Sequence, residues 1–272
     1  MHRVCLAALA IGADLELDTP LAFASAELIR ERAPKVVKAA ETLDFQTLTP
    51  VAGGLFDYKV FGPGTVIDAP PIADDEPLKS RKTQFARVTL GLPIPHPLVV
   101  ERLPDKLAEL AGWTRADLDR WLGGESQSEL ILALESHGCG ELVMRELPVL
   151  PPDLRPLRRL DDDRWAVSPL NDLYRRVIHR NARFAHVVET NAPHVIISSE
   201  RQQLHEAMFQ LFDTELRAVC GGPDRFAAAL RELDRHPADG ELTGRLYRTE
   251  SVLFALGMTR TPKTVSAPLE AA

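Results

Sequence analysis

Cysteine is scarce in this sequence, and its spacing excludes the usual metal and disulfide frameworks. Cys5, Cys139 and Cys220 lie far apart in a chain of 272 residues and match no metal-binding or redox motif. Such usage is typical of a reduced, cytoplasmic protein. The eight histidines form no HxH or HExxH pattern, so neither a metal site nor a cofactor is predicted.

Long hydrophobic runs are also absent. No apolar stretch approaches the roughly 20 residues that a membrane-spanning helix needs. The opening reads MHRVCLAALAIGA, with one arginine before a short apolar run, and Asp14 and Glu16 follow at once. This pattern favours a buried strand or a helical turn over a signal peptide.

Positive charge and catalytic motifs are lacking as well. The formal net charge of −7 argues against strong, direct nucleic-acid binding. The sequence contains no GxSxG, GxxxxGK[ST] or GxGxxG motif. Its acidic runs, Asp161 to Asp163 and Asp74 to Glu76, are consecutive side chains that point in different directions, which favours solvated turns over a magnesium site.

What the sequence does contain is typical of a globular α+β protein that is mainly helical. Hydrophobic residues make up 45% and charged residues 26%. Ser25 is placed to cap a helix, and Thr114 to cap another whose inner face carries Leu118, Trp121 and Leu122. The remaining elements predicted before and after the central stretch are a strand in GGLFDYKVFGP, a strand over 85–92, a short helix and a strand over 126–147, a polar loop in PPDLRPLRRLDDDRW, and helices over 224–236 and 244–257.

The stretch 168–220 predicts two long amphipathic helices joined by a short apolar tip. Gly221 and Gly222 would end the second helix. Spacings of three and four place the apolar residues of each helix on one face. These residues are Leu170, Leu173, Val177, Phe184 and Val188, followed by Leu204, Met208 and Leu211.

The ends of these two helices carry recognisable signals. Ser168 is a good N-cap, and Pro169 occupies the first helical position, where its missing N–H costs nothing. The first helix must end before Pro193. Ser199 and Gln202 have the spacing of a capping box that opens the second helix.

Basic residues line the first of these helices away from its apolar stripe. Arg176, Arg180 and Arg183 share one face, and Arg175 lies beside them. An exposed arginine stripe can be a solvated face, or it can dock a partner. The spacing alone leaves both interpretations open.

Three runs resemble the clamp region of the β′ subunit of bacterial RNA polymerase. They are LPVLPPDLRPL, LNDLYRRVIHRNARF and APHVIISSERQQLHEAMFQLFD. In that family this order leads from the lid loop into the clamp helices, an antiparallel coiled coil that holds region 2 of the sigma factor. The resemblance covers roughly 15 to 215 and is most specific from Leu147 to Asp213.

This sequence also departs from the family. The four-cysteine zinc ribbon, which the family places between the positions of Pro63 and Phe85, has no cysteine here, so no zinc is expected. The family's NADFDGD loop, which holds catalytic magnesium, has no counterpart. The resemblance therefore implies a truncated, non-catalytic paralogue that is not a polymerase on its own.

The resemblance implies an architecture and a set of partner-binding residues. It predicts a small mixed α/β clamp-like body with a projecting antiparallel helical hairpin, to which hydrophobic patterning adds C-terminal helices. The predicted segments are 1–62, a linker at 63–84, 85–167, the hairpin at 168–220, helices at 221–258 and, from composition, a disordered tail at 259–272. Ser198 and His194 replace a basic and an acidic residue of the family. The residues carried over as sigma-facing are Asn171, Arg175, Arg180, Arg183, Glu200 and Ala207, with Pro193, Ile196 and Ile197 at the hairpin tip.

Two functions of different kinds follow from the resemblance. The first is a free cytoplasmic protein that binds a sigma factor or a sigma-like regulator through the hairpin. The second is the clamp-bearing piece of a split RNA polymerase, which would bind other polymerase subunits. A relic without a partner is a third possibility, which the well-patterned helices over 224–257 disfavour.

Overall fold

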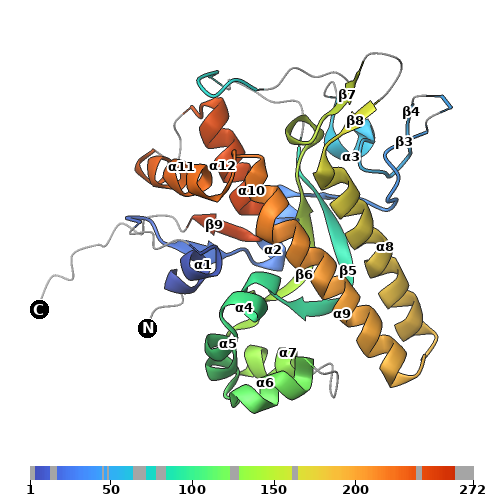
Figure 1. The fold of residues 1–272 in the computed structure, drawn as a ribbon, viewed down its shortest axis with the longest axis vertical. Helices are drawn as coiled ribbons and strands as arrows, with labels where there is room; N and C mark the ends of the chain where they lie inside the picture. Colours follow the sequence, from blue (N-terminus) through green and yellow to red (C-terminus); the bar gives the residue numbers. More distant parts are fainter. Residues whose placement is uncertain are drawn as a thin grey trace, which may run out of the picture.

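The molecule is a mainly helical α+β fold built on one continuous hydrophobic core (Figure 1). The computed structural model describes residues 4–12, 17–44, 46–47, 49–63, 72–77, 84–122, 129–160, 165–236 and 241–260. The core cluster contains buried residues from Ala7 to Met258, including those of the two long helices. The predicted fold class is confirmed. Within the described residues no helix is both long and apolar enough to cross a bilayer.

A three-stranded sheet lies at the centre, in the order β2-β5-β6. It consists of β2 (Lys35–Val36), β5 (Ala86–Pro95) and β6 (Val143–Val149), with β5 antiparallel to β6 and parallel to β2. The β5–β6 register shifts between Thr89 and Ile94, where Gly91 and Pro93 interrupt β5. Proline cannot donate to the ladder, which explains an irregularity at this point.

The two long helices are α8 (Pro169–Glu189) and α9 (His194–Gln210). They lie side by side, run in opposite directions and carry their connecting turn to one end of the molecule (Figure 1). Asn191 turns the chain with a φ of 49°. A π-helical segment, Leu211–Glu215, and α10 (Leu216–Ala218) continue from α9.

Glycine brings α8 close to the sheet. A Cβ atom at Gly91 would lie 2.8 Å from the Cβ of Ala185 on α8, so only glycine permits this approach. The side chain of Asn181 spans the same contact: its Oδ1 accepts from the Gly91 N–H at 2.8 Å and its Nδ2 donates to the Thr89 carbonyl at 3.0 Å. The middle of α8 is therefore fixed on β5.

Ser25 caps helix α2 (Ala26–Arg32) as predicted, because its hydroxyl oxygen accepts a hydrogen bond from the Leu28 N–H at 3.1 Å.

The remaining helices and strands surround the central sheet and the two long helices. These elements are α1 (Val4–Ala10), β1 (Leu21–Phe23), α2 (Ala26–Arg32), β3 (Leu43–Asp44), β4 (Thr49–Pro50), α3 (Tyr58–Phe61), α4 (Pro97–Arg102), α5 (Pro104–Ala111), α6 (Arg115–Leu122), α7 (Glu129–Ser136), the 3₁₀ turns Gly140–Leu142 and Pro152–Leu154, β7 (Leu157–Arg159), β8 (Trp165–Val167), α11 (Pro223–Arg235), α12 (Gly244–Ala255) and β9 (Met258–Arg260).

Several local predictions were wrong. The segment predicted as a strand before Gly62 contains the short helix α3, which Asp57 caps by accepting from the Lys59 N–H at 2.8 Å. The second long helix begins at His194, five residues before the predicted capping box at Ser199, because Pro193 already opens the helix. Leu122 is not on an inner face but is 36% exposed.

Two segments expected to lack structure form strands. Part of the predicted polar loop pairs as the antiparallel hairpin β7–β8. β9, whose last two residues fall in the predicted tail, pairs antiparallel with β1, so that Leu21 faces Arg260. Asp161 to Asp163 and 261–272 lie outside the described residues, as does most of the predicted linker at 63–84. The proposed segment boundaries remain predictions.

Gly244 is expected to be essential where the segment 72–77 crosses the start of α12. Its N–H donates to the Glu76 carbonyl at 2.9 Å, and a Cβ atom there would overlap the carbonyl oxygen of Ala73. Gly244→Ala should lower the free energy of unfolding by about 1–3 kcal/mol through this steric overlap. Urea denaturation checks this, with Gly140→Ala as the control because its new methyl group would meet nothing closer than 3.8 Å. Equal stability of the two variants would contradict the prediction.

Candidate docking surface on the α8–α9 helical pair

The base of α8 is attached to the body by a buried arginine. Arg155 is 0% exposed, and its Nε donates to the Leu150 carbonyl at 2.8 Å. One terminal nitrogen donates to Asn171 Oδ1 at 2.8 Å and the other to the Leu55 carbonyl at 2.7 Å. Asn171 returns a hydrogen bond from Nδ2 to the Arg155 carbonyl at 3.1 Å. This network joins the first turn of α8 to two separate loops.

Three aromatic rings enclose the same guanidinium. Its central carbon lies 5.0, 4.9 and 5.7 Å from the ring centroids of Phe56, Phe61 and Tyr174. Burial lowers the pKa of Arg155 to about 9 and raises the pKa of Tyr174 to about 12. Arg155 therefore stays protonated at neutral pH, and the base of α8 is rigid.

A buried carboxylate connects α8 to α9 farther toward the turn. The Glu200 side chain is 5% exposed, and its oxygens lie 2.7 Å from Arg183 Nε and 3.7 Å from an Arg180 terminal nitrogen. Nearer the base of the two helices, Arg176 donates a hydrogen bond to Gln210 Oε1 at 2.6 Å. The arginine stripe predicted from the sequence therefore also stabilises the helical pair, which the spacing could not indicate.

The structure places the predicted partner-binding residues in three groups: exposed, half-buried and buried. The side chains of Arg175 and Arg183 are 46% and 65% exposed, and Pro193 and Ile196 at the tip are exposed. Arg180 and Ile197 are half-buried. Asn171, Glu200 and Ala207 are buried in the fold.

The burial of the third group shows what these side chains contact within the fold, and their partner-binding role stays a prediction. Asn171 is enclosed because its amide holds Arg155, and Ala207 is enclosed because it faces the core of the helical pair. These side chains cannot meet a partner at the surface without local unfolding. The exposed residues of the helical pair are the ones available for contact in this structure.

Val195 is a surface residue that the sequence analysis missed. It is 78% exposed, the largest value among the exposed large hydrophobic residues of the described chain, and it lies in the first turn of α9 between His194 and Ile196. The signal was the run of three β-branched residues from Val195 to Ile197, which follows Pro193 and His194. We define the tip patch as Pro193, Val195 and Ile196.

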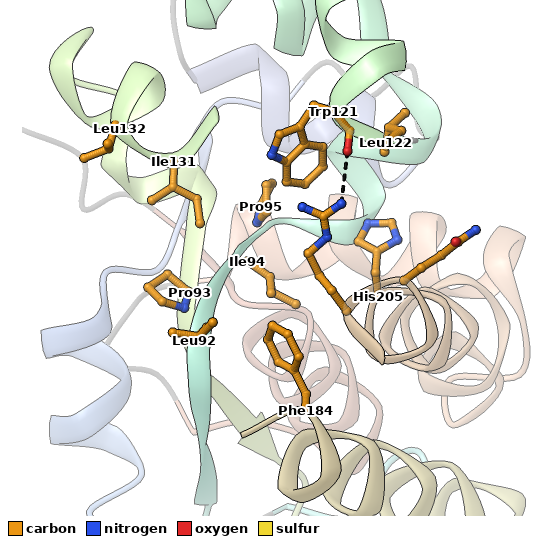
Figure 2. A pocket seen from close by; sticks show the side chains of 12 residues that line it. Leu92, Pro93, Ile94, Pro95, Trp121, Leu122, Ile131, Leu132, Phe184 and His205 are labelled. Atoms are coloured by element: carbon orange, nitrogen blue, oxygen red, sulfur yellow. Dashed lines mark hydrogen bonds between the residues drawn. The ribbon is translucent and has the colours of Figure 1, made fainter. Parts of the chain in front are cut away.

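An apolar groove of about 180 Å³ borders the helical pair on the side of α6 and α7 (Figure 2). The Arg201 guanidinium lies 4.5 Å from the centroid of the Trp121 ring and donates to the Trp121 carbonyl at 3.0 Å. The groove is lined by Leu92, Pro93, Ile94, Pro95, Trp121, Leu122, Ile131, Leu132, Phe184, Arg201, Gln202 and His205.

Histidine adds no charge to this groove at neutral pH. Burial lowers the pKa of His205 to about 4, with the Arg201 charge acting in the same direction. His205 Nδ1 lies 3.5 Å from a carboxylate oxygen of Glu101. The part of the chain that the structure describes holds no group of three or more His, Cys, Asp or Glu side chains placed to bind a metal ion.

Comparisons with known proteins show what this chain is similar to. The family model "RNA polymerase Rpb1, domain 1" matches residues 126–231, which include β6, α8, α9 and the first part of α11. The "DNA-directed RNA polymerase subunit beta'" of Stutzerimonas stutzeri (strain A1501) is 27% identical over 310 residues, covering 78% of this chain and 22% of the relative. The subunit of the same name from Ectopseudomonas mendocina (strain ymp) gives the same identity and coverage.

These matches define what the chain is similar to. Most of it resembles an N-terminal region of the bacterial RNA polymerase β′ subunit, and the helical pair lies within the matched part. The chain spans about a fifth of the length of the curated relatives it matches.

Proposed function

We propose that this chain is a non-catalytic, clamp-like protein of transcription that binds region 2 of a sigma factor through the α8–α9 pair. The observation that carries the proposal is the exposed tip patch at the free end of this pair, together with exposed arginines farther along α8, all within the part similar to β′. An apolar patch beside exposed guanidinium groups suits an amphipathic partner helix with acidic residues.

The residues of this surface would have different tasks. Val195 and Ile196 would bury apolar area in the complex, since both are exposed in the fold. Arg175 pairs with Asp172 at 3.2 Å, a surface pair that contributes little and exchanges readily for a partner carboxylate. The Glu200 network would keep the two helices in register while the partner binds.

A tip variant tests the proposal directly. The double variant Val195→Asp, Ile196→Asp should weaken binding of the purified chain to sigma region 2 at least about tenfold, because two apolar contacts are replaced by charges. Arg175→Glu should weaken it further and make the remaining affinity less dependent on salt. Isothermal titration calorimetry measures both effects.

The control is Leu132→Asp, which places the same charge on an apolar side chain that is 60% exposed on α7. It should bind like the wild type. The proposal is wrong if the wild type does not bind sigma region 2, or if the tip variant binds equally well. Exchanging Arg180 and Glu200 would be a weaker test, because Arg183 would then face a like charge and the pair itself would suffer.

A second candidate is the clamp-bearing piece of a split RNA polymerase. It is favoured by the similarity to a named polymerase subunit, whose other segments would then be supplied by separate chains. Affinity purification from native cells distinguishes the two. Recovery in equal amounts with the β subunit and a magnesium-binding fragment supports this candidate, whereas recovery with sigma alone supports the first.

A further inference from the structure

A second cavity lies away from the helical pair, between the β7 region and the helices α11 and α12. Its volume is about 660 Å³, which is within the range of small-molecule sites. Segments distant in the sequence form its walls: the segment at Ile72, the turn at Asp153, β7, the glycine turn before α11, and residues of α11 and α12. The sigma-binding function proposed above makes no use of it.

The lining of this cavity is basic although the chain is acidic. Four arginines and two aspartates line it, whereas the formal net charge of the whole chain is −7. The arginines are Arg158, Arg225, Arg245 and Arg248. A local positive site on an acidic protein attracts small anions and disfavours long polyanions, which the rest of the surface repels.

Two of these arginines form ion pairs within the protein and hold parts of the cavity wall in place. Arg248 donates to the Ile72 carbonyl at 2.6 Å and pairs with Asp74, one of the two lining aspartates. Arg245 pairs with Glu232 on α11. These contacts fix the segment at Ile72 and the facing helices as walls of the cavity.

The other two arginines are available for a ligand. Arg158 on β7 and Arg225 on α11 are exposed, and neither forms an ion pair with any residue that the structure describes. They belong to different walls of the same cavity. Free guanidinium groups present paired N–H donors that match phosphate oxygens, and two such groups can hold adjacent phosphates.

We propose that this cavity binds a small phosphate-bearing anion of the size of a nucleoside di- or triphosphate, with Arg158 and Arg225 as its charged ligands. The phosphates lie between the two walls, and the apolar part of the lining, which includes Leu154, Val219 and Ala229, contacts the rest of the ligand. Binding connects the β7–β8 hairpin to α11.

Calorimetric titration of the full chain with sodium tripolyphosphate tests the site. The wild type should bind in a saturable 1:1 manner at physiological ionic strength. The double variant Arg158→Ala, Arg225→Ala should lose at least about tenfold in affinity, because each change removes a charge-assisted hydrogen-bonding group. The control is Arg231→Ala, an exposed arginine on α11 that does not line the cavity, and it should bind like the wild type.

Three results would overturn the proposal. The first is the absence of saturable binding by the wild type. The second is an equal loss of affinity in the Arg231→Ala control, which would mean that net charge alone attracts the anion. The third concerns a longer polyanion. A single-stranded oligonucleotide serves as competitor: failure to displace tripolyphosphate supports a small-anion site, and tighter binding of the oligonucleotide than of tripolyphosphate at this cavity overturns it.

Discussion

Replacing Arg155 by methionine is expected to lower the free energy of unfolding by about 2–4 kcal/mol, although the change removes a buried charge. The variant would leave the carbonyl oxygens of Leu150 and Leu55 and the amide oxygen of Asn171 without their donor. Each buried acceptor that loses its partner costs about 1–3 kcal/mol. The surrounding rings lose their cation as well.

Relief of desolvation opposes this loss. Burial lowers the pKa of Arg155 to about 9, so desolvation of the charged guanidinium opposes its favourable contacts. Methionine would recover that cost, so the net effect is smaller than the sum of the lost hydrogen bonds. The loss still prevails because three acceptors and the ring contacts depend on one side chain.

Urea denaturation of Arg155→Met measures this balance, with Arg158→Met as the control. Arg158 lies three residues after Arg155 and is exposed. Its replacement should change the free energy of unfolding by no more than about 0.5 kcal/mol. If Arg155→Met is as stable as the wild type, the desolvation cost of the buried charge cancels the stabilisation from the Arg155 hydrogen bonds. The base of α8 would then be held by packing rather than by hydrogen bonds.

Mild acid should destabilise the protein by about 4 kcal/mol between pH 7 and pH 5, through two buried histidines. Burial lowers the pKa of His96 and of His205 to about 4, from 6.5 for each. The His96 ring lies between Phe23 and Phe212 and its Nε2 is 2.8 Å from the Leu256 carbonyl. Neither site accommodates a second proton readily.

The direction follows from where the protons bind. Because the folded-state pKa values lie below the unfolded ones, the unfolded chain binds more protons between about pH 4 and pH 6.5. The contribution of the two histidines to the free energy of unfolding is therefore fully present above about pH 6.5, and it declines as the pH falls through this window. Each histidine contributes about half of the decline.

Urea denaturation at pH 7, 6 and 5 gives the slope, and His205→Gln should reduce it by about half, since glutamine does not titrate. Comparing slopes rather than absolute stabilities separates titration from any packing defect in the variant. A stability that does not change over this range, or a variant with the wild-type slope, would show that the histidines are protonated in the folded state.

The sequence predicted the long elements of the fold well because their periodicity is strong. α8, α11 and α12 repeat apolar residues at helical spacing over three or more turns, and their predicted limits lie close to the observed ones. Short elements depend on single caps and on tertiary contacts. The four residues of α3 are helical because Asp57 accepts their N–H groups, a local signal that the apolar character of the segment concealed.

The docking surface was predictable in part, for a related reason. Helical spacing places Arg175 and Arg183 outward, but it does not reveal that Arg183 faces a carboxylate on the other helix. The burial of Asn171 depends on Arg155, which enters from a loop 16 residues earlier. Contacts of this kind are set by the folded arrangement and leave no periodic trace in the sequence.

The pairing of β1 with β9 has a consequence for how the protein is made. Leu21 emerges from the ribosome early, but its partner residue Arg260 is synthesised only after nearly all the intervening chain. Asp18 and Thr19 likewise wait for the Asp234 carboxylate that accepts from their N–H groups at 2.6 and 2.8 Å. The N-terminal segment therefore cannot complete this pairing until β9 has been synthesised, which makes it a contact of large sequence separation that forms late.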